Sequence, residues 1–267
     1  MQIQIGADPE LFLKRKGFFI NAHDMIPGTK AAPHPVNGGA VQVDGMALEF
    51  NINPAGKPEQ FVDNINTVLG ELRNMIPEDF DFSFAAVATF DPEYMLQQPP
   101  ESLLLGCEPD FDAYQGKENA KPDNAQPMRT AAGHVHIGWR EGEQDSQHIE
   151  ECRAITRQLD YVLGIPSMVL DHDFKRREMY GKAGAFRAKP YGAEYRVLSN
   201  FWLKSPALME WVFTNTKQGV DMLVDHGVDL FDKFGETARD IINNNKVEDA
   251  AYLLENDLSP YVNIRGV

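Results

Sequence analysis

Cysteine and positive charge are both scarce in this chain of 267 residues. Lys and Arg total 25 against 40 Asp and Glu, which gives a formal net charge of −15 at pH 7. This charge argues against a nucleic-acid backbone or an anionic membrane as the main partner. The two cysteines, Cys107 and Cys152, lie far apart and lack CxxC spacing. This spacing indicates neither a disulfide framework nor a structural zinc site, and we expect both thiols to be reduced and buried.

Long apolar runs and glycine-rich nucleotide motifs are also missing. No apolar segment approaches the length of a membrane-spanning helix, and the first residues lack the basic and apolar regions of a signal peptide. We therefore expect a cytoplasmic protein. Neither a Walker A sequence nor GxGxxG occurs, so a nucleotide would have to be held on a sheet. Without a linker or low-complexity tract, we expect one domain, residues 1–267, in which residues 206–267 form a helical C-terminal appendage.

The apolar pattern predicts both strands and helices. Alternation, or a short apolar run between turn residues, predicts strands at residues 1–13, 82–90, 133–138 and around 194–196, and one strand or a bulged pair of strands at 40–52. Apolar residues three or four positions apart predict helices at residues 57–76, 146–163, 206–224 and 247–254, the second ended by Gly164 and Pro166. Turn-forming residues indicate a loop or short hairpin at 19–37 and irregular structure at 91–130.

Acidic residues occur inside the predicted strands. Asp8 and Glu10 are two positions apart, so in extended backbone their carboxylates share one face. Pro9 between them has no N–H, which restricts this segment to an edge, a bulge or the unpaired side of a strand. Asp44 and Glu49 stand among apolar neighbours and need a cation or hydrogen-bond donors if buried. No Lys or Arg occurs between Lys30 and Lys57, which favours metal ions.

The segment Gly133-His134-Val135-His136-Ile137-Gly138 carries two histidines on one face of a predicted strand. Two interpretations are open at this point. The imidazoles are either a hydrogen-bonded pair on a half-buried strand or members of a binding site, and the rest of the chain must decide between them.

Residues 176–192 concentrate Arg, Lys, Gly and Tyr in an otherwise acidic chain. Arginine binds phosphate or carboxylate through two parallel hydrogen bonds, and glycine lets backbone amides approach a ligand, so this composition is typical of an anion site. The candidate anion ligands in and after this segment are Arg177, Lys182, Arg187 and Arg196. Glu194 shares a face with Arg196 on the strand that follows.

Together the acids and histidines form a hard, oxygen-rich ligand set. Such a set suits Mg²⁺ or Mn²⁺, and the number of acids indicates more than one ion. Two divalent ions with arginines nearby are the usual equipment of phosphoryl transfer. The proposed metal ligands are Asp8, Glu10, Asp44, Glu49, His134 and Glu194.

The order of these motifs resembles the glutamine synthetase and gamma-glutamylcysteine synthetase superfamily. Within it, the chain is most similar to the phage-encoded type 2 carboxylate-amine ligases over roughly residues 1–205. The matching segments are Gly6-Ala7-Asp8-Pro9-Glu10, Asp44 to Glu49, Gly106-Cys107-Glu108-Pro109-Asp110-Phe111, Arg129 to Gly138, Arg187, and Tyr191 to Arg196.

This resemblance implies an α+β fold, a curved and mainly antiparallel sheet with ATP and two or three Mg²⁺ or Mn²⁺ ions on its concave face and helices on its convex face. It implies one ion at Glu10, Asp44 and Glu49 and another at Asp8, His134 and Glu194. His136 would then contact the nucleotide. Arg187 and Arg196 would stabilise the γ-phosphoryl group while a substrate carboxylate attacks it, and an amine would displace the resulting acyl phosphate.

The implied activity is an ATP-dependent ligase acting on small-molecule or peptide carboxylates and amines, in the host cytoplasm if the chain is phage-encoded. Two alternatives remain open: a phosphotransferase of the guanidino-kinase type, and a catalytically inactive binding protein on the same fold. The C-terminal helices contain no chemical cluster, so we assign them to packing and to assembly of a homo-oligomer.

Overall fold

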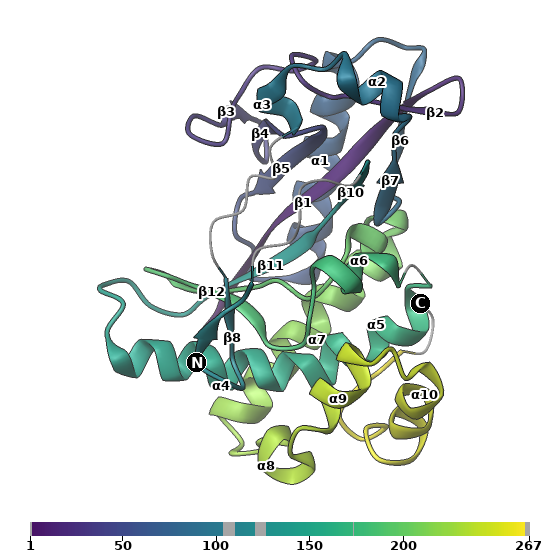
Figure 1. The fold of residues 1–267 in the computed structure, drawn as a ribbon. Helices are drawn as coiled ribbons and strands as arrows, with labels where there is room; N and C mark the ends of the chain where they lie inside the picture. The colour runs from purple at the N-terminus through teal and green to yellow at the C-terminus, as the bar shows by residue number, and fades with distance from the viewer. Residues whose placement is uncertain (1, 104–109, 121–126, 173, 265–267) are drawn as a thin grey trace.

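The computed structural model describes residues 2–103, 110–120, 127–172 and 174–264. One large open sheet crosses the molecule, and helices cover one side of it. The helices of the C-terminal part of the chain lie together at one end of the molecule (Figure 1). The paired strands of this sheet run antiparallel, which confirms the expected α+β class with a mainly antiparallel sheet. Within the described residues no helix is both long and apolar enough to span a bilayer.

The sheet follows the order β3-β4-β5-β1-β11-β13-β12-β8-β9, and β2 and β6 also pair with β1. A separate two-stranded sheet joins β7 and β10. The strands are β1 Gln4–Arg15, β2 Phe18–Ile20, β3 His34–Val36, β4 Gly39–Asp44, β5 Ala47–Ile52, β6 Phe80–Ser83, β7 Val87–Thr89, β8 Phe111–Asp112, β9 Lys117–Glu118, β10 Met128–Thr130, β11 Gly133–Gly138, β12 Ala185–Lys189 and β13 Gly192–Tyr195.

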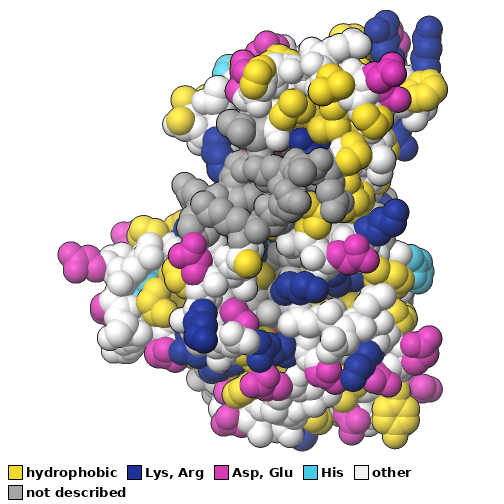
Figure 2. All heavy atoms as spheres, viewed as in Figure 1, with side chains coloured by type: hydrophobic (Ala, Val, Ile, Leu, Met, Phe, Trp, Pro, Cys, Tyr) yellow, Lys and Arg dark blue, Asp and Glu magenta, His cyan; other side chains and the backbone are white. Residues whose placement is uncertain are grey.

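Most helices lie in the second half of the chain. They are α1 Pro58–Met75, α2 Pro92–Leu96, α3 Pro100–Leu103, α4 Ser146–Leu159, α5 Ile165–Leu170, α6 Lys175–Met179, α7 Pro206–Val224, α8 Leu230–Phe234, α9 Thr237–Asn243 and α10 Val247–Asn256, with a π-helical turn at Asp160–Gly164 and a 3-10 helix at Asn200–Lys204. On the visible face of this helical half, acidic and basic side chains are interspersed (Figure 2).

Alternation along β1 separates an apolar face from a polar face. Ile5 and Leu11 are fully buried, as are Val135 and Ile137 on the adjacent β11. They belong to one core with the apolar stripes of α1, α4 and α7, including Phe61, Leu159 and Val212. Helices therefore cover one face of the sheet, and the even-numbered side chains of β1 and β11 face the other way. This core also includes residues of α9 and α10.

Pro9 lies inside the sheet, on the unpaired side of its strand. The Ile5 N–H donates to Ala55 on the β5 side, whereas the Glu10 N–H donates to Ala132 on the β11 side. Backbone N–H groups two residues apart on a strand point to the same side, so the backbone nitrogen of Pro9, like that of Ile5, faces β5. Its missing N–H breaks no hydrogen bond of the ladder, because the pairing of β1 with β5 begins only at Glu10. This is the third of the three positions that the sequence allowed.

Three predicted elements need correction. The helix of residues 146–163 does not stop at Gly164 and Pro166, because the π-helical turn joins α4 directly to α5. Pro166 lies in the first turn of α5, just after this π-helical turn. The single strand of residues 82–90 is two strands, β6 and β7, in different sheets. Residues 91–130, expected to be irregular, include α2, α3, β8, β9 and β10 in the part that the structure describes.

A second, smaller hydrophobic cluster lies on the polar side of the sheet. It contains Phe12, Met46, Ala47, Ala88, Phe90 and Ala131. Phe12, Met46 and Ala47 also line the cavity described below. This cluster therefore forms an apolar wall where β1 leaves the acidic part of the sheet.

Candidate active site

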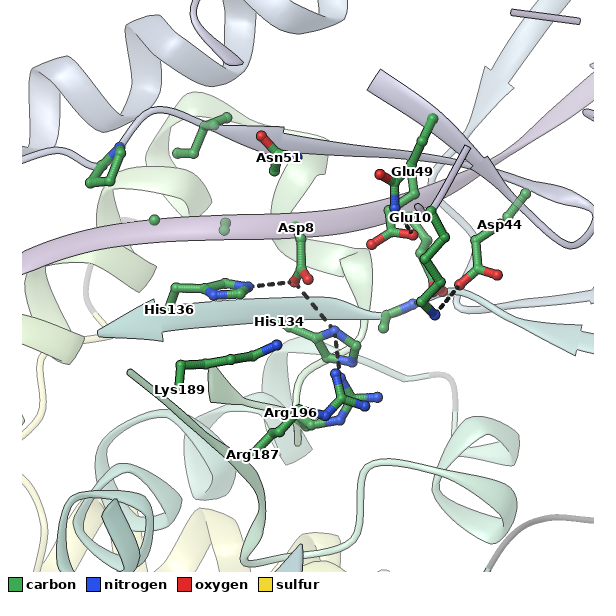
Figure 3. Close-up of a pocket in the computed structure, with 18 of the residues that line it drawn as sticks. Asp8, Glu10, Asp44, Glu49, Asn51, His134, His136, Arg187, Lys189 and Arg196 are labelled. Atoms are coloured by element: carbon green, nitrogen blue, oxygen red, sulfur yellow. Dashed lines mark hydrogen bonds and ion pairs between the residues drawn. The ribbon is translucent and has the colours of Figure 1, made fainter. Parts of the chain in front are cut away.

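Strand register brings the predicted site residues onto one face. In the β1–β11 ladder, Asp8 is opposite His134 and Gly6 is opposite His136. His136 is in turn opposite Glu194 on β13, and Glu194 is opposite Arg187 on β12. Residues paired across antiparallel strands point to the same side of the sheet, so the acidic, imidazole and guanidinium groups converge although they come from distant parts of the chain (Figure 3).

These side chains line a cavity of about 990 Å³ on the polar face. This volume is at the upper end of the range for ligand pockets, roughly 300–1,000 Å³. The lining also includes Trp139 and Arg140, the first residues of β1, Arg129 and Tyr180, and part of the apolar wall. The cavity is therefore large enough for more than one small ligand.

The first acidic group consists of Glu10, Asp44 and Glu49, whose carboxylate oxygens lie within 4.8 Å of one another. Glu10 and Glu49 are directly opposite each other on β1 and β5, an arrangement of like charges that destabilises a sheet. The Ala132 N–H donates to Glu10 Oε2 over 2.8 Å, and Gln42 Nε2 donates to Glu49 Oε2 over 2.8 Å.

This crowding changes the protonation of the group. Burial and the neighbouring Asp44 raise the pKa of Glu10 to about 7. Burial, together with Asp8, Glu10 and Asp44, raises the pKa of Glu49 well above its usual value. Lys30 Nζ lies 3.2 Å from Asp44 Oδ2. A divalent cation among the three carboxylates would offset the remaining repulsion, so the group fits a hard metal ion.

The second group consists of Asp8, His136 and Glu194, with one ligand atom from each within 4.8 Å of the others. His136 Nε2 lies 2.9 Å from Asp8 Oδ1 (Figure 3). Both atoms are buried, and the attraction of Asp8 outweighs burial and raises the pKa of His136. A divalent ion could take the place of this proton, and the three ligand atoms lie close enough together to hold one, so this group also fits a metal.

His134 contacts the same carboxylates from the neighbouring position. Its Nδ1 lies 3.3 Å from Asp8 Oδ1 and 3.4 Å from Glu194 Oε1. Arg196 Nη1, which can only donate, lies 3.3 Å from the same nitrogen. Burial and Arg196 lower the pKa of His134 to about 4, so the ring is neutral at pH 7 and Nδ1 presents a lone pair.

Glu194 is fully buried beneath three cations. Arg187 Nη1 lies 3.2 Å and Lys189 Nζ 2.9 Å from its Oε2, and Arg196 Nη1 donates to its Oε1. Burial and Asp8 oppose its ionisation, but the attraction of Arg196 and the two histidines lowers the pKa of Glu194 to about 2. Arg196 Nε also lies 3.2 Å from Asp110 Oδ2. The cationic edge of the cavity is thus anchored by buried carboxylates.

Not every predicted site residue lies at the cavity. Asp8, Glu10, Asp44, Glu49, His134, His136, Arg187 and Arg196 line it, and Glu194 lies just below its surface. Arg177 is buried elsewhere, with Nη2 donating to Ser167 Oγ over 3.0 Å. Lys182 is not among the lining residues either; it follows the tight turn at Gly181. Residues 106–109 of the GCEPDF segment, including Cys107, lie outside the described residues, and Cys152 is a buried free thiol.

Several lining residues were absent from the sequence prediction. Lys189 is two positions from Arg187 and shares its strand face, so strand alternation could have predicted that it lies at the cavity as well. Lys30 reaches the cavity from a loop, Arg129 from the short strand β10 and Arg176 from the short helix α6, and no local pattern indicates that. Tyr191, between β12 and β13, lies against His136.

Residues 127–227 match the family model described as "Phage phiEco32-like COOH.NH2 ligase-type 2". No curated protein matches the chain significantly. A bifunctional glutathione synthetase from Pasteurella multocida is similar in structure over 82% of this chain, with 13% identity and a TM-score of 0.46. This chain spans only 38% of that synthetase.

A second structure, titled a novel glutamine synthase homolog, is similar over 97% of this chain and 67% of its own length, with 11% identity and a TM-score of 0.43. The family match rests on sequence and includes β11, β12 and β13, which carry the two histidines, the cationic edge and Glu194. The resemblance inferred from the motifs is therefore confirmed over residues 127–227, which match the phage phiEco32-like family of type 2 carboxylate-amine ligases.

Proposed function

We propose that the chain is an ATP- and Mg²⁺-dependent ligase that joins a carboxylate to an amine through an acyl phosphate. The observation that carries this proposal is the pair of ion-binding groups on one sheet face, Glu10 with Asp44 and Glu49, and Asp8 with His136 and Glu194. Both lie in or directly beneath one cavity that has Arg187, Lys189 and Arg196 at its edge. The family match over residues 127–227 supports the same reaction class.

Bound divalent ions would neutralise phosphate charge and align the reacting oxygens. The carboxylates of the first group would hold one ion, and Asp8, Glu194 and an imidazole would hold the other. Arg187, Lys189 and Arg196 stabilise the negative charge of the transferred phosphoryl group, and their contacts with Glu194 keep them oriented before ATP binds. No side chain is needed as a nucleophile, because the substrate carboxylate itself attacks.

The apolar wall and the acidic group lie next to each other in the cavity. We place the carboxylate and amine substrates at this end, beside Glu10, and the phosphates of ATP at the cationic edge. We further propose one domain over residues 1–267, with residues 206–267 as its helical C-terminal part, acting in the cytoplasm.

Product analysis tests this function directly. The protein is incubated with MgATP and a pooled library of amines, amino acids and short peptides, and new masses are sought by mass spectrometry. A ligase yields an amide with ADP and phosphate. A stable phosphorylated acceptor would instead indicate a phosphotransferase. The Asp44→Asn/Glu49→Gln double variant is the matched control, because it keeps the shape of the cavity but removes two ion ligands. Equal amide yield from this control would refute the assigned site.

A further inference from the structure

Tyr191 lies in the turn between β12 and β13, and its phenol is hydrogen-bonded to His136 Nδ1. The two rings are in contact, with centroids 5.9 Å apart. The backbone holds this turn in place, since the Tyr191 carbonyl accepts from the N–H groups of Trp139 and Arg140 over 2.9 and 3.2 Å. At Gly192, φ is +153° and a Cβ would lie 2.0 Å from the Ile137 carbonyl oxygen, so only glycine permits this approach.

The other nitrogen of the same ring faces the second ion-binding group. His136 Nε2 is buried and lies 2.9 Å from Asp8 Oδ1, in an ion pair that is not aligned as a hydrogen bond. A divalent cation would take the place of the proton between these atoms and would contact both of them. Imidazole ligates a metal through one nitrogen while the other donates to a second group, and that donation selects the tautomer.

We propose that Tyr191 is a positioning residue that accepts a hydrogen bond from His136 Nδ1–H and thereby presents Nε2, with Asp8 and Glu194, to a divalent cation. This inference rests on the proposed function. The Tyr191 phenol oxygen has lone pairs and can accept this hydrogen bond. The two histidines then have the reverse of the roles that the resemblance implies: His136 ligates the ion, and His134 Nδ1 accepts from Arg196.

Manganese binding provides the test, because Mn²⁺ replaces Mg²⁺ at oxygen-rich sites and is paramagnetic. The wild type and variants are titrated with Mn²⁺ in the presence of AMPPNP, a non-hydrolysable ATP analogue. Free Mn²⁺ is followed by EPR, and the coupling of bound Mn²⁺ to imidazole nitrogen by pulsed EPR. The first group contributes only carboxylates, so nitrogen coupling reports the second group alone.

We expect Tyr191→Phe to weaken Mn²⁺ binding at the nitrogen-coupled site by about 10- to 100-fold, the usual effect of losing such a hydrogen bond. The matched control is Tyr161→Phe, which also loses a phenolic hydrogen bond, to the Gly235 carbonyl over 2.8 Å, but away from the cavity. Its Mn²⁺ affinity should equal that of the wild type. Thermal melts in EDTA identify any variant that fails to fold.

Two histidine variants keep the proposal falsifiable if Tyr191→Phe does not fold. Nitrogen coupling should be lost in His136→Ala and retained in His134→Ala. Coupling that persists in His136→Ala, or unchanged affinity in Tyr191→Phe, overturns this inference but leaves the proposed ligase intact. Absence of Mn²⁺ binding by the wild type overturns the ligase proposal and this inference with it.

Discussion

Replacing Glu10 with glutamine should stabilise the protein at alkaline pH. Burial and the neighbouring Asp44 raise the pKa of Glu10 from 4.5 to about 7 in the folded chain. The folded state therefore holds a proton that the unfolded state loses, and stability falls as pH rises from about 4.5 to about 7. Above pH 7 the full penalty applies. A pKa difference of this size corresponds to about 3 kcal/mol, which a neutral glutamine avoids. Its amide oxygen can still accept from the Ala132 N–H.

The assay is urea unfolding in EDTA at pH 8 and pH 5. At pH 8, Glu10→Gln should raise the free energy of unfolding by up to about 3 kcal/mol relative to the wild type, and at pH 5 by less than about 1 kcal/mol, because most of the penalty has not yet developed. Mg²⁺ added at pH 8 should then stabilise the wild type more than the variant, since only the wild type retains all three carboxylates.

The control is Glu78→Gln, an exposed acid between α1 and β6, which should change the free energy of unfolding by no more than about 0.5 kcal/mol at either pH. A Glu10→Gln variant less stable than the wild type at pH 8 would refute this account of the acidic group. So would an equal gain at both pH values, because it could not come from the ionisation of Glu10.

Three further predictions concern individual side chains. Lys30→Met should tighten Mg²⁺ binding in calorimetry, because the ammonium no longer competes for Asp44; unchanged affinity would show that Lys30 does not compete. Arg187→Lys should lower ATP turnover with little change in thermal stability, since a planar, two-pronged donor becomes a point charge; normal kinetics would argue against its phosphate role. At pH 4, Asp160→Asn should lower the free energy of unfolding in urea by about 1–3 kcal/mol, because the amide nitrogen would face one of the three donors that bond Asp160, the Tyr114 and Tyr195 hydroxyls and the Gly184 N–H. At this pH the raised pKa of Asp160 leaves little charge penalty for the amide to remove, and wild-type stability would contradict the prediction.

The site combines two electrostatic arrangements within one cavity. Around Glu10 and Glu49, carboxylates repel one another and hold protons more tightly. Around Glu194, cations attract the carboxylate and keep it ionised. The first arrangement favours binding of a divalent cation, and the second keeps arginine and lysine side chains oriented toward an anion. Phosphoryl transfer, the reaction proposed for this cavity, uses both carboxylates that bind divalent cations and cationic side chains that face the phosphate.

Much of this site was predictable from sequence because strand geometry is local. Side chains two positions apart share a face whatever the fold, so Asp8 with Glu10, His134 with His136, and Glu194 with Arg196 could be paired in advance. The amphipathic stripe of α1 and the boundaries of β11 were predictable for the same reason. Composition likewise indicated an anion site in the basic segment, but it could not separate Arg187, which lines the cavity, from Arg177, which does not.

Tertiary structure alone decided which of these pairs meet and what completes them. Register sets Glu10 opposite Glu49 and Gly6 opposite His136, and it depends on pairing between segments far apart in the chain. Lys30 reaches Asp44 from a loop, although the sequence indicated no nearby cation, because distance along a chain does not limit distance in space. The contact of Tyr191 with His136 depends on a turn that only glycine at position 192 allows. The sequence by itself thus determined which chemical groups share a strand face, and the fold determined their partners, because a side chain's direction is a local property and its neighbours are not.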